Sequence, residues 1–144
     1  MSIERILVVD DDELSRGYLS EALQRNGYSV DNAQDGQEAV SMTDGQSYDM
    51  IFLDMRMPRM GGLKVLEKVK KTSKDTTVVI MTAYGSIESA VEAMQKGAYD
   101  YIIKPFSLED IESLLKRVQE RQKLIDENKY WRSLALLCAI LFSF

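Results

Sequence analysis

Four aspartates carry the clearest chemical signal in the chain. Asp10, Asp11 and Asp12 are consecutive after one apolar run, and Asp54 follows another. Carboxylates that converge raise one another's pKa unless a cation neutralises them. Hard oxygen ligands without His or Cys select Mg²⁺, which also takes a phosphoryl oxygen. For Asp12 a helix N-cap is the preferred role, and for the other three we expect a phosphoryl-transfer site.

A hydroxyl and an amine follow two further apolar runs, at Thr82 and Lys104. Each has an ordinary alternative, because Thr often closes a strand and most lysines are solvated. The chain has no histidine, which excludes His-based triads, imidazole zinc sites and phosphorylation on histidine. A carboxylate attacks a phosphoryl group without a general base, so this chemistry does not need one.

These residues need a scaffold that brings the ends of separate apolar runs together. Short β-branched runs alternate with longer segments of helical spacing, which indicates βαβ units around a parallel sheet. Ligands bind such sheets at the carboxyl ends of the strands. The predicted strands are 5–10, 28–32, 49–54, 77–82 and 99–103.

The helix boundaries are marked by capping residues and glycines. Gly27 and Gly97 stand where a helix ends in a left-handed residue. Asp or Ser precedes four of the helices, and in two cases an acid three residues later suggests a capping box. The predicted N-caps are Asp12, Asp35 (with Glu38), Ser86 and Ser107 (with Asp110), and the predicted helices are 13–26, 37–43, 63–71, 87–96 and 108 to about 132.

Composition fits one small domain of 144 residues. A net charge of −5 argues against direct nucleic acid binding by this chain. The single Cys138 cannot form an intrachain disulfide, and the N-terminus lacks a secretory signal, so we expect a cytoplasmic protein. The apolar stretch 134–144 falls short of the roughly 18 to 20 residues that cross a bilayer, so no transmembrane segment is expected.

Four motifs resemble the signatures of response-regulator receiver domains. They are VVDDD at 8–12, LDMRMP at 53–58, MTA at 81–83 and KPF at 104–106, in order at the ends of predicted strands. The resemblance covers about residues 3–122. It implies an α/β fold: a doubly wound, five-stranded parallel sheet of flavodoxin-like order 2-1-3-4-5, here with an extended C-terminal helix.

The resemblance also assigns a metal site. It implies that Asp11, Asp54 and the backbone carbonyl of Arg56 bind Mg²⁺ directly, while Asp10 helps through water. Mg²⁺ is the cofactor expected. One departure is Gly61, where the family usually has Asp or Asn, and we expect it to loosen a loop without touching the chemistry.

The remaining roles concern the phosphoryl group. The resemblance implies that Asp54 accepts it from a partner histidine kinase, that Lys104 contacts it and that Thr82 hydrogen-bonds to it. Tyr101 corresponds to the aromatic switch residue, although from composition alone a plain strand residue is the preferred reading. The resemblance also implies that the peptide bond between Lys104 and Pro105 is cis.

The C-terminal part resembles the linker of sigma-54-dependent activators of the nitrogen-regulator type, in which the receiver precedes an ATPase and a DNA-binding domain. We expect a receiver at 1–122, a helical linker at 123–133 and an apolar tail at 134–144. Truncation is the first explanation of that tail; a hook for a partner and a weak membrane contact are the alternatives. The chain lacks a G-x-x-x-x-G-K-[S/T] loop, which argues against ATP hydrolysis.

Several functions compete on these residues. The leading one is a phospho-acceptor switch that controls output, with transcription as the expected output, and not an enzyme beyond its own phosphoryl transfer and autodephosphorylation. A homodimer could form through the fourth helix, fifth strand, fifth helix and linker. A Mg²⁺-dependent phosphohydrolase normally has an acid two residues after the nucleophile, where Arg56 stands. A pseudo-receiver would not need the intact acidic set. A flavodoxin-like nucleotide binder would have glycines and amide donors in place of Asp10, Asp11 and Asp12.

Overall fold

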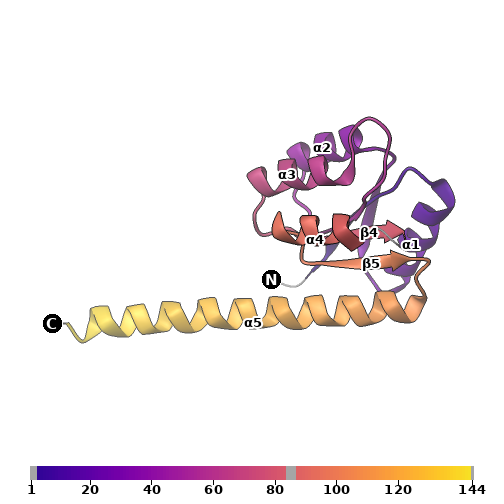
Figure 1. Cartoon of the computed structure of the whole chain (residues 1–144). Helices are drawn as coiled ribbons and strands as arrows, with labels where there is room; N and C mark the ends of the chain where they lie inside the picture. The colour runs from indigo at the N-terminus through magenta and orange to yellow at the C-terminus, as the bar shows by residue number, and fades with distance from the viewer. Residues whose placement is uncertain (1–2, 84–86, 144) are drawn as a thin grey trace.

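The computed structural model describes residues 3–83 and 87–143, which form a parallel sheet of five strands with helices on both faces (Figure 1). The elements are β1 (Arg5–Val9), α1 (Glu13–Arg25), β2 (Ser29–Ala33), α2 (Gly36–Gly45), β3 (Met50–Asp54), α3 (Gly62–Thr72), β4 (Thr77–Ala83), α4 (Ile87–Gln95), β5 (Asp100–Lys104) and α5 (Leu108–Leu141). The strand order is β2-β1-β3-β4-β5. The predicted fold is therefore confirmed, including the place of β2 at an edge.

The central strands are buried on both faces because successive side chains point to opposite sides of the sheet. On β1, Ile6 and Val8 pack with side chains of α1 and α5. Leu7 and Val9 pack on the other face with side chains of α2, α3 and α4. Two apolar layers thus hold the sheet rigid and leave its carboxyl edge to carry polar groups.

Most of the predicted helix ends are present. Asp12 caps α1 by accepting a hydrogen bond from the Ser15 N–H at 3.3 Å. The capping box of Ser107 and Asp110 starts α5. Gly27 and Gly97 have φ values of 91° and 109°, the left-handed conformation that glycine adopts without a steric penalty.

Two other predicted caps turn out differently. Asp35 accepts the Glu38 N–H at 2.8 Å, but the Glu38 carboxylate accepts from the N–H of Gln34. Asp35 is therefore an N-cap, but Glu38 bonds the N–H of Gln34 in place of the Asp35 N–H that a capping box would use. Ser86, the predicted cap of α4, lies outside the described residues.

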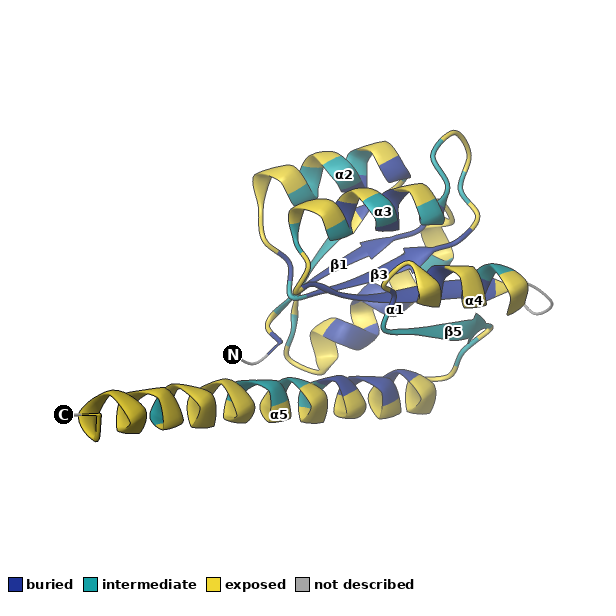
Figure 2. Cartoon of the chain, turned by 60° about the vertical axis from the view of Figure 1, so that its left-hand side comes forward, coloured by how far each residue is buried: buried dark blue, intermediate teal, exposed yellow. Residues whose placement is uncertain are grey.

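Helix α5 is longer than predicted, since it continues past residue 132 to Leu141. The resemblance to known linkers stops near residue 133, but residues 133–141 contain no Gly or Pro and are rich in Leu and Ala, which favour helix. Its buried residues, Ile111 to Val118, all lie in the first part of the helix, and its far part is exposed (Figure 2). None of the described helices is both long enough and apolar enough to cross a membrane.

Candidate functional site

Three carboxylates meet at the carboxyl ends of β1 and β3. Asp10 directly follows β1 and is fully buried, while Asp54 ends β3 and is 8% exposed. These side chains come together because β1 and β3 pair in parallel, with Val9 opposite Leu53. Asp11 is exposed at the mouth of the site, and carboxylate oxygens of the three aspartates all lie within 4.8 Å of one another.

The turn after β1 fixes Asp10 from both sides. The N–H of Asp12 donates to Asp10 Oδ1 at 2.9 Å, and the guanidinium of Arg16 donates to the Asp10 carbonyl at 2.8 Å. Asp12 itself is occupied as the N-cap of α1, so it belongs to the scaffold. The sequence reasoning missed Arg16, whose only signal was a position one turn into a helix that starts at the acidic cluster.

Lys104 brings a cation to this cluster from the end of β5. Its Nζ lies 2.7 Å from Asp10 Oδ2 and 3.6 Å from Asp54 Oδ2. The bond from Lys104 to Pro105 is cis, as the family resemblance implies. An amine between two buried carboxylates offsets part of their repulsion, and it is placed to contact a third negative group.

The two buried carboxyls have pKa values shifted in opposite directions. Burial raises the pKa of Asp54 to about 6, against the opposing charge of Lys104 and with the help of the negative charge of Asp10. Burial also tends to raise the pKa of Asp10, but hydrogen bonds from Lys104 and the Asp12 N–H outweigh it and hold that pKa below its ordinary value. Asp54 is thus the carboxylate with the least compensated charge.

Thr82 lies on β4, the strand next to that of Asp54, and Tyr101 lies on β5, one strand further along the sheet. Thr82 is 2% exposed and one residue beyond Met81, which pairs with Asp54; its hydroxyl donates to the Ala83 carbonyl at 3.4 Å. Tyr101 pairs with Ile80 and is half-buried against the core on the α4 side. The described contacts include none between Thr82 and the Asp54 carboxylate.

The loop after Asp54 folds tightly around the site. The N–H of Arg56 donates to Asp54 Oδ1 at 3.4 Å. A Cβ on Gly62 would lie 2.6 Å from the Asp54 carbonyl oxygen, so only glycine fits there, and the sequence reasoning missed this residue. A Cβ on Gly61 would meet its nearest atom, the Met55 carbonyl oxygen, at 3.7 Å, an ordinary contact. The family departure at Gly61 therefore falls where a side chain would also fit.

This donor set fits a hard divalent cation. Asp10, Asp11 and Asp54 offer carboxylate oxygens, and the described residues bring no thiolate or imidazole to them. A cation would also offset the cost of burying the Asp54 charge and the repulsion from Asp10, which together raise the pKa of Asp54. The site can therefore hold a metal beside a buried carboxylate and a lysine, an arrangement suited to binding or receiving a phosphoryl group.

Comparison with known proteins identifies the family to which this fold and site belong. Residues 6–116 match the response regulator receiver domain family. The chain belongs to this family, whose members are signalling domains of two-component systems. The resemblance predicted from the four motifs is confirmed.

Two individual relatives show how far the similarity extends along each chain. The chain is 36% identical over 129 residues to the regulatory protein AtoC of Escherichia coli, covering 90% of this chain and 28% of AtoC. It is 40% identical over 123 residues to the response regulator MprA of Mycobacterium ulcerans, covering 85% of this chain and 53% of MprA. The chain thus spans about half the length of MprA and less of AtoC.

Comparison with solved structures agrees with the sequence comparison. The crystal structure of NtrX from Brucella abortus superposes with a TM-score of 0.84 at 32% identity, covering 91% of this chain and 30% of that one. The NtrX receiver domain alone gives a TM-score of 0.76 at 33% identity, covering 80% of this chain and 98% of that domain. The predicted likeness to nitrogen-regulator-type receivers is confirmed.

Proposed function

We propose that this chain is a phospho-acceptor switch in which Asp54 takes a phosphoryl group from a phosphohistidine of a partner kinase. A carboxylate oxygen of Asp54 attacks phosphorus, the P–N bond breaks, and the imidazole keeps the electron pair. The observation that carries the proposal is the nearly buried Asp54 carboxylate, flanked by Asp10, Asp11 and Lys104 at the open carboxyl edge of the sheet.

Each neighbour has a part in this reaction. Asp10 and Asp11, with Asp54 and the Arg56 carbonyl, would hold Mg²⁺, which when bound supplies positive charge to the developing phosphoryl oxygens. Lys104 pairs with another phosphoryl oxygen from the β5 side, and Thr82 donates a hydrogen bond to a third. Because positioning and charge do most of the catalysis, the chain needs no acid–base residue.

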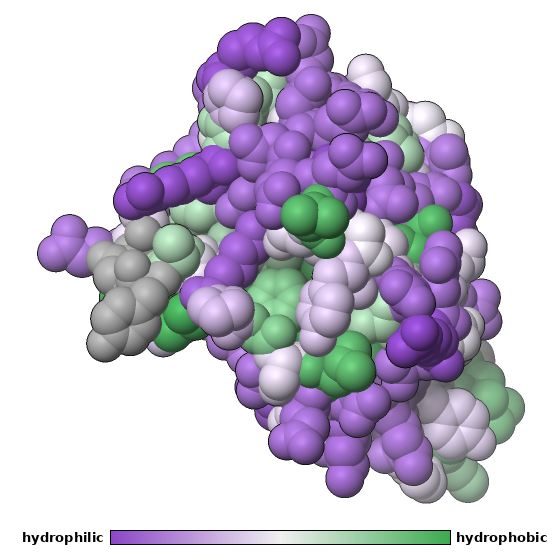
Figure 3. Space-filling model, turned by 90° about the vertical axis from the view of Figure 1, so that its right-hand side faces the viewer, coloured by the Kyte–Doolittle hydropathy of each residue, from purple (hydrophilic) through white to green (hydrophobic). Residues whose placement is uncertain are grey.

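The rim of the site suits a protein donor. Figure 3 looks onto this edge, where separate hydrophobic side chains stand among hydrophilic ones. Leu14 and Tyr18 on α1 are 84% and 46% exposed, Leu108 at the start of α5 is 42% exposed, and the Tyr18 ring lies 6.3 Å from that of Phe106. A kinase that covers these side chains would exclude water around the reacting groups.

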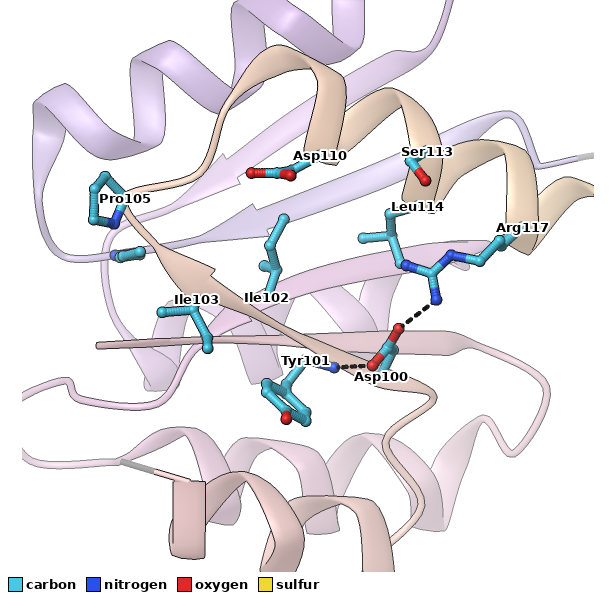
Figure 4. Close-up of a pocket in the computed structure, with 10 residues that line it drawn as sticks. Asp100, Tyr101, Ile102, Ile103, Pro105, Asp110, Ser113, Leu114 and Arg117 are labelled. Atoms are coloured by element: carbon cyan, nitrogen blue, oxygen red, sulfur yellow. Dashed lines mark hydrogen bonds and ion pairs between the residues drawn. The ribbon is translucent and has the colours of Figure 1, made fainter. Parts of the chain in front are cut away.

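The output face is formed by α4, β5 and α5. Ile87, Val91 and Met94 make an exposed apolar stripe along α4. A groove of about 750 Å³ runs between β5 and α5, where the guanidinium of Arg117 donates to the Asp100 carboxylate at 2.9 Å (Figure 4). We propose that phosphorylation moves Thr82 and Tyr101 and so reshapes this face, which then forms a homodimer together with the linker.

The same proposal assigns a domain boundary, a linker and an output to the chain. Gln119 donates to the Ile3 carbonyl and to the Tyr28 hydroxyl, which supports a receiver that extends to residue 122. Residues 123–133 would be a helical linker to an output that controls transcription in the cytoplasm. Turnover of external phosphate esters is not expected, because Arg56 stands where phosphohydrolases of this type have their acid.

One experiment tests the core of the proposal. The chain is incubated with Mg²⁺ and phosphoramidate, a small donor with a P–N bond, and its intact mass is measured over time. We expect one added phosphoryl group in the wild type and none in Asp54→Asn. Equal labelling of the two would refute the assignment, and no labelling of either would favour a pseudo-receiver.

A further inference from the structure

The far end of α5 carries an apolar segment that the described part of the chain leaves uncovered. Residues 134–142, called here the apolar segment, have the sequence LALLCAILF. Leu136, Leu137, Ile140 and Leu141 are each more than half exposed, and Phe142 is 86% exposed. Figures 1 and 2 show this end of α5 projecting well clear of the sheet and its helices. Water faces apolar side chains here without any compensating contact.

These side chains surround the helix instead of forming one stripe. At about 100° per residue, Leu136 and Leu141 point in directions about 140° apart, and Phe142 points to a third side. A two-stranded coiled coil would bury only one seam. Tyr130, Leu134, Leu137 and Leu141 recur at the 4-3-4 spacing of such a seam, and this seam leaves Leu136 and Phe142 outside it. A helix that is apolar all round is typical of a large protein core or of lipid, and the described part of the chain places no core around this end of α5 (Figure 2).

The residues just before the apolar segment match the polar boundary of a bilayer. Tyr130 and Trp131 are 59% and 64% exposed, and their rings meet edge to face at 5.5 Å. Aromatic residues of this kind concentrate where lipid headgroups meet water. The two nearest charged residues, Lys129 and Arg132, are both cations and complement lipid phosphates.

At 1.5 Å per residue, the nine residues of the apolar segment would reach about 14 Å into the roughly 30 Å hydrocarbon core of a bilayer. From all-round exposure and flanking charge, we propose that residues 134–142 insert into a phospholipid bilayer, with Tyr130 to Arg132 at the headgroups. The receiver would then be held at the membrane surface by α5. This proposal does not depend on phosphorylation of Asp54.

Trp131 is the only tryptophan of the chain and reports directly on insertion. The full chain is mixed with phosphatidylcholine vesicles, followed by flotation and by Trp131 emission with and without brominated acyl chains. We expect the protein to float with the vesicles, its emission to shift to shorter wavelength, and bromine to quench it. The flanking stretch 119–132 carries four cations and three acids, so anionic lipid should strengthen binding only slightly.

A matched pair of variants separates insertion from self-association. Leu136→Glu and Leu124→Glu add the same charge at leucines of the same helix that are 65% and 66% exposed. Insertion predicts about 100-fold weaker vesicle binding for Leu136→Glu, from the cost of a charged residue in a membrane helix, and little change for Leu124→Glu. Equal loss in both, no flotation of the wild type, or the same emission shift without vesicles in a larger assembly would overturn the proposal.

Discussion

Lys104 is bound more closely by Asp10 than by Asp54, the proposed acceptor. Its Nζ lies 2.7 Å from the first carboxylate and 3.6 Å from the second. Asp10 is therefore stabilised in its charged form, whereas Asp54 keeps a raised pKa. The metal-free site thus carries unfavourable charge at Asp54, the proposed acceptor, and a metal that compensates this charge is expected to stabilise the fold.

The first prediction is that Asp54→Asn stabilises the metal-free fold at pH 7. A carboxyl whose pKa rises from 3.8 to about 6 on folding is charged in both states at pH 7, and folding then carries a penalty. Two pKa units set an upper limit of about 3 kcal/mol. The penalty develops as pH rises through the window from about 4 to 6. Urea unfolding with EDTA should show a gain for Asp54→Asn at pH 7 that vanishes near pH 4.

Added Mg²⁺ provides the control for this experiment. Because a cation at the site compensates the Asp54 charge, it should stabilise the wild type more than Asp54→Asn, and the difference at pH 7 should shrink. A variant that is less stable than the wild type at pH 7 without metal would show that Asp54 supports the fold, contrary to the pKa argument.

The second prediction separates two adjacent aspartates. Asp11 is exposed at the metal cluster, so Asp11→Ala should weaken Mg²⁺ binding at least tenfold and leave metal-free stability unchanged or slightly higher. Asp12 caps α1, so Asp12→Ala should cost about 1 kcal/mol of stability and leave the metal affinity nearly unchanged. Titration calorimetry measures the Mg²⁺ affinity of both variants, and urea unfolding measures their stability. If the same variant lost more in both measurements, these separate roles would be contradicted.

Features that depend on local sequence signals could be predicted from the sequence. The strands and most helix ends were predictable because apolar runs, caps and glycines such as Gly27 are local signals. The convergence of Asp10, Asp54 and Lys104 followed from a parallel sheet, whose carboxyl ends share one edge. Pattern alone could not give the strand order; that came from the resemblance.

Other features depend on contacts that sequence spacing does not reveal. The hydrogen bond from Arg16 to the Asp10 carbonyl and the closeness of Gly62 to the Asp54 carbonyl arise from how a loop closes on the sheet. The Glu38 carboxylate accepts from the N–H of Gln34, a contact that the spacing of Asp35 and Glu38 does not reveal. The extension of α5 to Leu141 was missed because the resemblance ended before the helix-forming residues did.

The third prediction concerns Gly61 and Gly62, the N-cap and the first residue of α3. A Cβ on Gly62 would lie 2.6 Å from the Asp54 carbonyl oxygen and 2.9 Å from the Met55 Cα, both backbone atoms that cannot move aside cheaply. Gly62→Ala should therefore destabilise the chain by about 1–3 kcal/mol and slow labelling of Asp54. Gly61→Ala, whose Cβ meets nothing closer than 3.7 Å, should cost less than about 1 kcal/mol, as a small N-cap effect, and leave labelling unchanged. Equal effects of both substitutions on urea unfolding would show that loop flexibility, not this contact, is what matters.

The last prediction tests the coupling from the site to the output face. Thr82 is buried between the strands of Asp54 and Tyr101, and it can leave its hydrogen bond to the Ala83 carbonyl to donate to a phosphoryl oxygen. That movement frees space toward which the half-buried Tyr101 ring can turn. Thr82→Ala should therefore still accept a phosphoryl group on Asp54, but beryllium fluoride should change neither its sedimentation nor the NMR signals of its Tyr101 ring. Thr82→Ser, which keeps the hydroxyl, should respond like the wild type. An equal shift in wild type and Thr82→Ala would show that the signal leaves the site by another route.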